Sequence, residues 1–166
     1  VYDTVLKAHL AVLDAVKPGL PCNEADRIAR DIIEKDYPGT FGHGLGHGVG
    51  VEIHEEPRFS RLDPTPCEAG MVVTDEPGIY EEGEVGIRIE NELVCVEREK
   101  NQYGQFLGFE AVTYCPIDLA PVRAELLDES EKAWLNAFHQ TVYDTLAPRL
   151  TAPERAWLAE KTKALA

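Results

Sequence analysis

The chain has 166 residues, of which 44% are hydrophobic and 28% are charged, as is ordinary for a globular protein with one sizeable core. Its formal net charge of −14 disfavours a nucleic acid or an anionic membrane as partner, because both are bound through cationic side chains. No apolar run reaches about 18 residues, so we expect no membrane span, and no secretory leader is visible.

The cysteines give no sign of a cross-linked scaffold. They contain no C-x-x-C pair, and their spacings are wide and irregular, at Cys22, Cys67, Cys95 and Cys115. This pattern disfavours a disulfide framework or a zinc ribbon. We expect free, mostly buried thiols in a reducing cytoplasm.

Two helices are predicted first. Residues 3–17 carry apolar side chains at helical spacing, and Pro18-Gly19 ends the pattern. This stripe comprises Leu6, Leu10, Leu13 and Val16. Asn23 is the candidate N-cap of a second helix near residues 24–36, which Pro38-Gly39 closes. Its predicted buried face comprises Ala25, Ile28, Ala29, Ile32 and Ile33.

A glycine- and histidine-rich stretch follows, from Gly42 to Gly50 and on to His54. It holds three of the five histidines, and its five glycines disfavour a helix by roughly 1 kcal/mol each. In an extended chain, His43 and His47 would share a face with Leu45 and Val49, and the glycine side would admit another backbone or a ligand. His54 has the opposite parity. A dense imidazole cluster points to metal binding or proton transfer, and a glycine-rich turn with surface histidines is the alternative.

The residues that follow are predicted to form strands joined by loops. Residues 49–54 have a half-buried strand pattern, residues 56–69 are loop-like, and Met71–Glu76 forms a strand. After a turn or longer loop from Pro77 to Glu84, a single long strand is expected over Ile87–Glu97. One of its faces would carry Ile87, Ile89, Asn91, Leu93 and Cys95, and the other Arg88, Glu90, Glu92, Val94 and Val96.

The last third of the chain is predicted to be one more strand and two helices. The strand covers Phe106–Thr113, after a polar link at residues 99–105. The first helix runs over about residues 128–147, and the second starts near Thr151, with Pro153 and Glu154 early in it.

Two downstream carboxylates, Glu76 and Glu90, fit the imidazole cluster chemically. One neutral imidazole and two carboxylates suit Mn²⁺, Co²⁺, Fe²⁺ or Zn²⁺ better than soft metals. Several carboxylates around one site also suggest a pair of ions that bind a bridging water and stabilise an oxyanion during amide hydrolysis. Other histidines nearby would orient the substrate carbonyl or move a proton.

Four segments in this order and spacing resemble the second half of a pita-bread (M24-type) metallopeptidase. They are His43–Gly50, His54-Glu55, Thr74–Gly78 and Gly86–Asn91. That family includes methionine aminopeptidase, prolidase and Xaa-Pro aminopeptidase (aminopeptidase P). The resemblance implies an α+β fold in which helices cover a curved antiparallel sheet.

The resemblance also implies roles for single residues. His47 and Glu76 match metal ligands, and Glu90 matches the glutamate that bridges two metal ions. His43 and His54 match catalytic histidines that contact the substrate and help to stabilise the tetrahedral intermediate. Arg88 matches an arginine close to the site, although it could equally serve as cross-strand partner of a carboxylate.

The C-terminal part resembles the extension of larger Xaa-Pro aminopeptidases, through Phe106–Ile117 and Trp134–His139. We therefore expect residues 1–98 to be the C-terminal half of a catalytic domain and residues 99–166 an extension that packs on it and contributes to a homodimer. His9 and His139 are interpreted as structural.

Two further aspartate ligands of the family would precede residue 1, so the chain is expected to be a fragment with three of five ligands and little activity alone. The leading hypothesis is a cytoplasmic aminopeptidase that uses two divalent ions, manganese first among them, and removes the N-terminal residue from peptides with proline in second position. A prolidase that cuts Xaa-Pro dipeptides and a metal-free binding module are the alternatives.

Overall fold

A computed structural model of the protein describes residues 1–15, 17 and 19–165, in two compact units, Val1–Thr113 and Tyr114–Ala166. Within the described residues, the first unit contains two helices and seven strands. Its helices are α1 (Tyr2–Ala15) and α2 (Cys22–Asp36), and its strands are β1 (Gly46–Gly48), β2 (Glu55–Phe59), β3 (Val72–Asp75), β4 (Gly78–Glu81), β5 (Val85–Arg88), β6 (Asn91–Asn101) and β7 (Gly104–Ala111).

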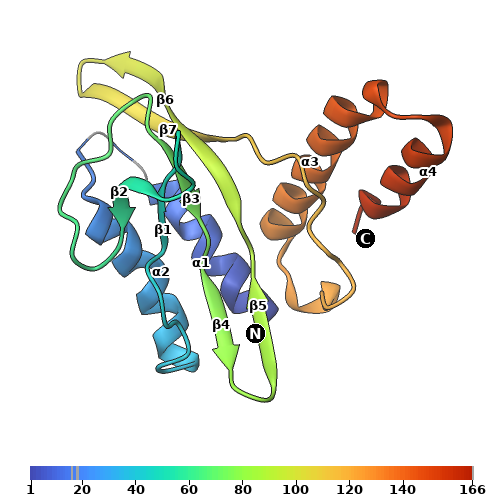
Figure 1. Ribbon diagram of the computed structural model, residues 1–166, viewed down its shortest axis with the longest axis horizontal. Helices are drawn as coiled ribbons and strands as arrows, with labels where there is room; N and C mark the ends of the chain where they lie inside the picture. The colour runs from blue at the N-terminus through green and yellow to red at the C-terminus, as the bar shows by residue number, and fades with distance from the viewer. Residues whose placement is uncertain (16, 18, 166) are drawn as a thin grey trace. The chain divides into compact units, whose positions relative to one another are not determined.

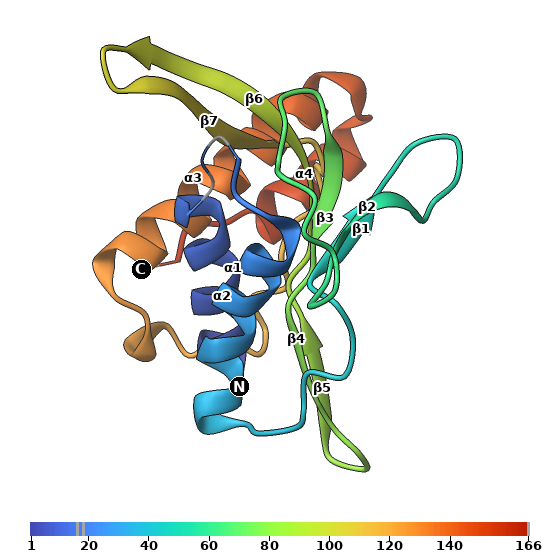
Figure 2. The ribbon, with the colours of Figure 1, turned by 90° about the vertical axis from the view of Figure 1, so that its left-hand side faces the viewer.

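Five strands of the first unit form one antiparallel sheet in the order β2-β1-β3-β6-β7, and β4 and β5 form a separate hairpin. Helices α1 and α2 lie on one side of this sheet (Figures 1 and 2). The architecture is therefore the predicted one, α+β with helices against an antiparallel sheet.

Both N-terminal helices form where they were predicted, with two differences. The buried face of α1 centres on Val5, Leu6, Ala8, His9 and Val12, while Leu10 and Leu13 are only half-buried. Val16 and Pro18 lie outside the described residues. The N-cap of α2 is Pro21, so the prediction of Asn23 was wrong. The reason is that the first backbone N–H groups of α2 donate to carbonyls of the loop before β3, so no side-chain cap is needed.

The prediction of a half-buried strand over residues 49–54 was also wrong. These residues form the connection between β1 and β2, in which Val51 and Ile53 are exposed. The strand begins only at Glu55 and contains Pro57, which the sheet tolerates because β2 is an edge strand. The strand pattern failed here because alternation also occurs by chance in a short, glycine-containing loop.

The strand predicted over Met71–Glu76 is confirmed as β3, but the long strand over Ile87–Glu97 is divided. Its first two residues end β5, and β6 begins at Asn91, so Ile89 and Glu90 lie between two sheets. The predicted alternation nevertheless continues across this break. Ile89, Asn91, Leu93 and Cys95 are buried, and their neighbours are half-exposed or exposed.

The predicted strand over Phe106–Thr113 is present as β7, which pairs with β6 in a longer hairpin than expected. Cys22, Cys67 and Cys95 are buried and Cys115 is exposed, all as free thiols, as predicted. Burial raises the pKa of the Cys95 thiol to about 11, so that thiol stays protonated near neutral pH.

The second unit is helical, with α3 (Glu129–Leu146), α4 (Ala152–Lys161) and the short 3₁₀ turns η1 (Ala124–Leu126) and η2 (Ala147–Arg149). A capping box of Asp128 and Glu131 begins α3, and one of Thr151 and Glu154 begins α4, as the sequence indicated for the latter. Neither these helices nor the others in the described part of the chain has the length and apolar character needed to cross a membrane. The predicted boundary at residues 98 and 99 between catalytic half and extension stays a prediction.

Candidate metal centre

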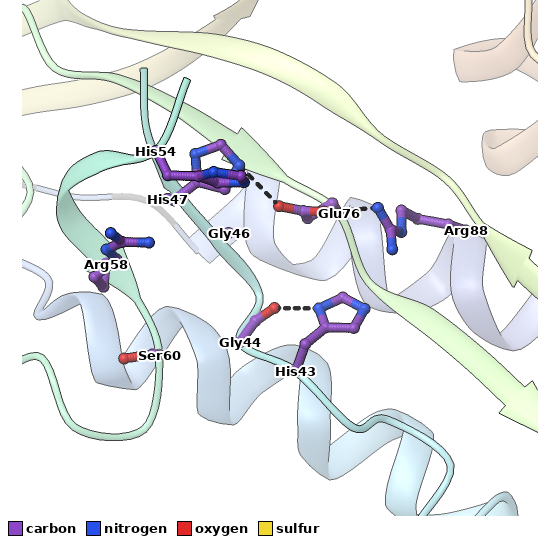
Figure 3. A pocket seen from close by; sticks show the side chains of 9 residues that line it. All are labelled: His43, Gly44, Gly46, His47, His54, Arg58, Ser60, Glu76 and Arg88. Atoms are coloured by element: carbon purple, nitrogen blue, oxygen red, sulfur yellow. Dashed lines mark hydrogen bonds and ion pairs between the residues drawn. The ribbon is translucent and has the colours of Figure 1, made fainter. Parts of the chain in front are cut away.

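A pocket of about 430 Å³ opens on the first unit where β1, β2, β3 and β5 approach one another. Figure 3 shows the side chains around it, contributed by separate parts of the chain. It is lined by His43, Gly44, Gly46, His47, His54, Arg58, Ser60, Glu76 and Arg88. The predicted catalytic residues and two of the three predicted metal ligands therefore meet at one place.

A buried ion pair of α2 holds the segment that carries His43. Arg30 donates to both oxygens of Asp26 at 2.9 Å and to the backbone carbonyls of Phe41 and His43 at 2.8 and 2.7 Å. Asp26 Oδ1 in turn accepts the backbone N–H of Leu45 at 3.0 Å. The segment before β1 is thus fixed by side chains of the helix and not by a strand ladder, and Leu45 is fully buried while His43 reaches the pocket.

Gly46 allows β1 to approach β3 closely. A Cβ atom at this position would lie 1.9 Å from the backbone oxygen of Thr74, a distance no side chain can occupy. The Thr74 hydroxyl accepts the backbone N–H of His47 at 3.1 Å and donates to Glu76 Oε1 at 2.9 Å. The prediction that another backbone can approach the glycine side of this stretch is confirmed at Gly46. The hydroxyl of Thr74 also holds the backbone of His47 and the carboxylate of Glu76 near each other.

The imidazole of His47 is oriented with one nitrogen toward Glu76. Its Nδ1 lies 2.9 Å from the carbonyl oxygen of Gly48, which can only accept, so the Nδ1 proton is donated there. In the neutral ring Nε2 then carries a lone pair, and it lies 3.3 Å from Glu76 Oε1. Two atoms that both offer lone pairs attract each other at this distance only when they share a proton or a cation. A divalent ion bound by both atoms fits this arrangement.

The other two pocket histidines take different positions. The His54 ring stands edge-on to the His47 ring, with centroids 4.3 Å apart, and it arrives from the β1–β2 connection (Figure 3). His43 contacts its neighbour's carbonyl, Gly44 O, through Nδ1 at 2.6 Å and the Tyr80 hydroxyl through Nε2 at 3.0 Å. The parity argument for His54 does not apply, because residues 49–54 form a connection and not a strand.

Arg88 joins the carboxylates of the site. Its Nη1 lies 3.1 Å from Glu76 Oε2 and 3.8 Å from Glu90 Oε2, and its Nε donates to the Tyr80 hydroxyl at 2.7 Å. The alternative interpretation of Arg88 as partner of a carboxylate is thus present in the structure. Contact of Arg88 with a substrate stays a prediction.

Glu90 is near this group but does not line the pocket. Burial raises the pKa of its carboxyl, and so does the negative charge of Glu76, whereas Arg88 opposes the rise. Among the residues that the structure describes, no three histidine, cysteine or acidic side chains are arranged to hold a metal ion. Of the three predicted ligands, His47 and Glu76 contact each other, while Glu90 contacts only the guanidinium of Arg88, which also contacts Glu76. The three-ligand assignment stays a prediction.

The sequence did not single out Tyr80, Thr74, Arg58 or Ser60. Thr74 could have been found, because it precedes Glu76 by two residues in a predicted strand and so shares its face. Tyr80 follows in the β4–β5 hairpin, where no periodic pattern was recognised. Arg58 and Ser60 lie at the end of β2, in a region predicted to be loop.

Comparison with protein families matches residues 1–97 to metallopeptidase family M24 and residues 105–165 to the C-terminal region of peptidase M24. A probable Xaa-Pro aminopeptidase P from Coprinopsis cinerea is 41% identical over 97% of the chain, which spans 28% of that relative.

Solved structures agree. The X-prolyl aminopeptidase from Caenorhabditis elegans, described as a cytosolic enzyme with a di-nuclear active site, is 35% identical, with a TM-score of 0.84 over 99% of this chain and 28% of that one. A prolidase from Pyrococcus furiosus is 44% identical, with a TM-score of 0.59 over 66% of this chain and 30% of that one. These likenesses confirm the pita-bread fold predicted from the sequence.

Proposed function

Because the chain belongs to metallopeptidase family M24, we propose that it supplies part of the metal centre of an aminopeptidase that releases the N-terminal residue from peptides with proline in second position. The observation that carries this proposal is the contact between His47 Nε2 and Glu76 Oε1 inside the pocket. The names of the aminopeptidase P relatives, which cover nearly the whole chain, support the substrate class.

In this proposal His47 and Glu76 are ligands of a divalent ion, and Glu90 is the third ligand of the chain. Bound divalent ions would polarise the scissile carbonyl and supply an activated water. Thr74 fixes one Glu76 oxygen and the backbone of His47 together, so both donors are oriented before any ion binds. The positive charge of Arg88 lies beside the carboxylates of Glu76 and Glu90.

His43 and His54 act on the substrate. The Tyr80 hydroxyl contacts His43 Nε2 and accepts from Arg88 Nε, so the imidazole, the phenol and the guanidinium form one hydrogen-bonded chain that ends at Glu76. Such a chain holds His43 in a fixed orientation beside the reacting carbonyl. His54 is exposed at the mouth of the pocket, where its ring can donate to an oxyanion as the carbonyl becomes tetrahedral.

The chain spans about 28% of the length of the curated relative described above. We propose that two aspartates outside the chain complete a site for two divalent ions, with manganese as the first candidate and cobalt, zinc or iron as others. A cytoplasmic location and a homodimer to which the second unit contributes are part of the same proposal.

Peptide assays test the substrate class. The full-length protein with Mn²⁺ should cleave a tripeptide with proline in second position and release its first residue, at a rate well above that for an Xaa-Pro dipeptide. Preference for the dipeptide would establish the prolidase alternative. Turnover of peptides without proline at equal rates would overturn the proposal. The isolated chain should show little or no turnover.

Metal analysis tests the binding-module alternative. The purified full-length protein, loaded with Mn²⁺ and desalted, should carry between one and two ions per chain by elemental analysis. Less than roughly one ion per chain, together with no peptide hydrolysis, would favour a metal-free binding module.

A further inference from the structure

A buried polar cluster lies on the side of β3 opposite Glu76. His9 of α1 has its Nδ1 2.8 Å from Asp75 Oδ2, and its Nε2 lies 3.3 Å from Asn91 Nδ2. His9 and Asp75 have no exposed surface, and Asn91 is 1% exposed. We refer to His9, Asp75 and Asn91 as the buried cluster.

The contacts of the buried cluster have one consistent direction. The amide nitrogen of Asn91 can only donate, so His9 Nε2 accepts from it. The proton of the neutral ring is then on Nδ1, the nitrogen that lies within ion-pair distance of Asp75 Oδ2. One imidazole therefore joins a carboxylate of β3 to an amide of β6, and both of its nitrogens are used.

The position of the cluster relative to the proposed ligands is the second observation. Asp75 and Asn91 are paired across β3 and β6 in the sheet register. Asp75 directly precedes Glu76, and Asn91 directly follows Glu90. Because neighbouring side chains of a strand point to opposite faces, the cluster holds from behind the two peptide units from which the proposed glutamate ligands project.

Burial makes this connection rigid. A carboxylate without exposed surface is strongly destabilised unless a neighbouring group stabilises its charge, so Asp75 stays beside the His9 ring. His9 itself is a fully buried residue of α1, and α1 lies against the sheet (Figure 2). The separation of the strand segments at Glu76 and Glu90 is thus tied to the helix through one ring.

We propose that His9 is a positioning residue for the metal centre, setting the relative placement of Glu76 and Glu90 through Asp75 and Asn91 without touching metal or substrate. This rests on the proposed function, because it concerns the affinity of that same centre. Affinity for a divalent ion depends on ligands that are held in place beforehand, and supporting partners change it by about 10- to 100-fold.

The test compares two buried histidines with the same substitution in the full-length protein. His9→Gln keeps an amide near the position of Nε2 and loses the donor to Asp75. His139→Gln is the matched control, because His139 is equally buried, in α3 of the second unit, and accepts the backbone N–H of Ile117 through Nε2. The readouts are the dissociation constant for Mn²⁺, by calorimetry, and the melting temperature of the metal-free protein.

We expect His9→Gln to weaken Mn²⁺ binding about tenfold and His139→Gln to change it less than about twofold, even where both lower the melting temperature by similar amounts. Mn²⁺ binding by His9→Gln that equals that of the wild type would overturn the inference, as would equal weakening by both variants. If His9→Gln does not fold, His9→Asn replaces it. That change keeps a donor toward Asp75 and loses the contact to Asn91, and it should weaken binding severalfold, with unchanged binding contradicting the inference.

The two proposals fail in different ways. If the wild-type protein binds no Mn²⁺, the proposed function is wrong, and the inference falls with it. If the wild type binds Mn²⁺ and hydrolyses the tripeptide while His9→Gln binds the ion as tightly, only the inference is wrong.

Discussion

The histidines of the pocket and the histidines of the two cores differ in what their rings contact. His9 and His139 are fully buried, and each ring has a fixed partner inside its own unit. His43, His47 and His54 line one pocket, and the Nε2 atom of His47 faces a carboxylate oxygen. Histidine is thus a buried residue with an internal partner in the cores, whereas in the pocket its ring nitrogens face a space that a ligand can enter.

Two neighbouring carboxylates, Asp75 and Glu76, differ in the same way. Asp75 points into the core, where His9 is its partner, and burial raises the pKa of its carboxyl while His9 opposes that rise. Glu76, the next residue, points into the pocket toward His47 and Arg88. Because neighbouring side chains point to opposite sides, a carboxylate with a partner in the core and a proposed metal ligand are consecutive residues.

The largest expected effect is that of replacing His47. His47→Gln should lower kcat/KM of the full-length protein by about 1000-fold, equivalent to about 4 kcal/mol, because it removes a proposed metal ligand. His139→Gln, the matched change in a core, should leave kcat/KM within about threefold. Assays with the proline-containing tripeptide decide this, and a His47→Gln variant that retains a tenth of the activity would contradict the assignment.

The second prediction concerns the close approach of β1 to β3. Gly46→Ala should lower the free energy of unfolding by about 3 kcal/mol, because the new methyl group would overlap the backbone oxygen of Thr74. Gly42→Ala is the control, since a Cβ there meets nothing within 4 Å. Urea denaturation measures both, and equal stability of the two variants would show that the strands do not approach as described.

The third prediction concerns the chain of hydrogen bonds from His43 to Glu76. Tyr80→Phe removes the hydroxyl that contacts both His43 and Arg88, so kcat/KM should fall about tenfold, the effect of one lost hydrogen bond. The melting temperature should change little, because the ring remains. Wild-type kcat/KM in this variant would remove Tyr80 from the site.

The smallest expected effect is a pH dependence of stability from the second unit. Burial lowers the pKa of His139 below its ordinary value of 6.5, so the folded state favours the neutral ring. Its contribution to stability is therefore complete above pH 6.5 and is lost as the pH falls below that value toward the folded-state pKa.

Urea denaturation between pH 8 and about pH 5 checks this, with His139→Leu as the variant that lacks the titrating ring. The wild type should lose more stability than the variant on acidification. Parallel curves for the two proteins would contradict the account of His139.

Much of the fold could be predicted from local patterns. The helices near residues 24–36 and 128–147 have clear apolar faces, and the strand predicted over Met71–Glu76 is present as β3. The break at Glu90 could not be predicted, because alternation in the sequence continues from β5 into β6 while the backbone passes from one sheet to the other. The strand prediction for residues 49–54 failed for the opposite reason, because the alternating pattern there has no partner strand.

The site was predictable in its residues but not in its contacts. Resemblance and ligand chemistry identified His47 and Glu76, and the structure places them side by side. The bridging position of Arg88 and the role of Tyr80 depend on the β4–β5 hairpin, whose register the sequence did not indicate. The cluster behind the sheet depends on His9 lying on the buried face of α1, and the predicted apolar stripe included Leu6 of that face but not His9.

The central claim is that His47 and Glu76 bind a divalent ion in this pocket. Anomalous diffraction from crystals of the full-length protein grown with Mn²⁺ tests it most directly. We predict a manganese peak about 2.0–2.3 Å from His47 Nε2 and from a Glu76 oxygen. Ordered His47 and Glu76 side chains without a peak beside them, in crystals that bind manganese elsewhere, would contradict the account.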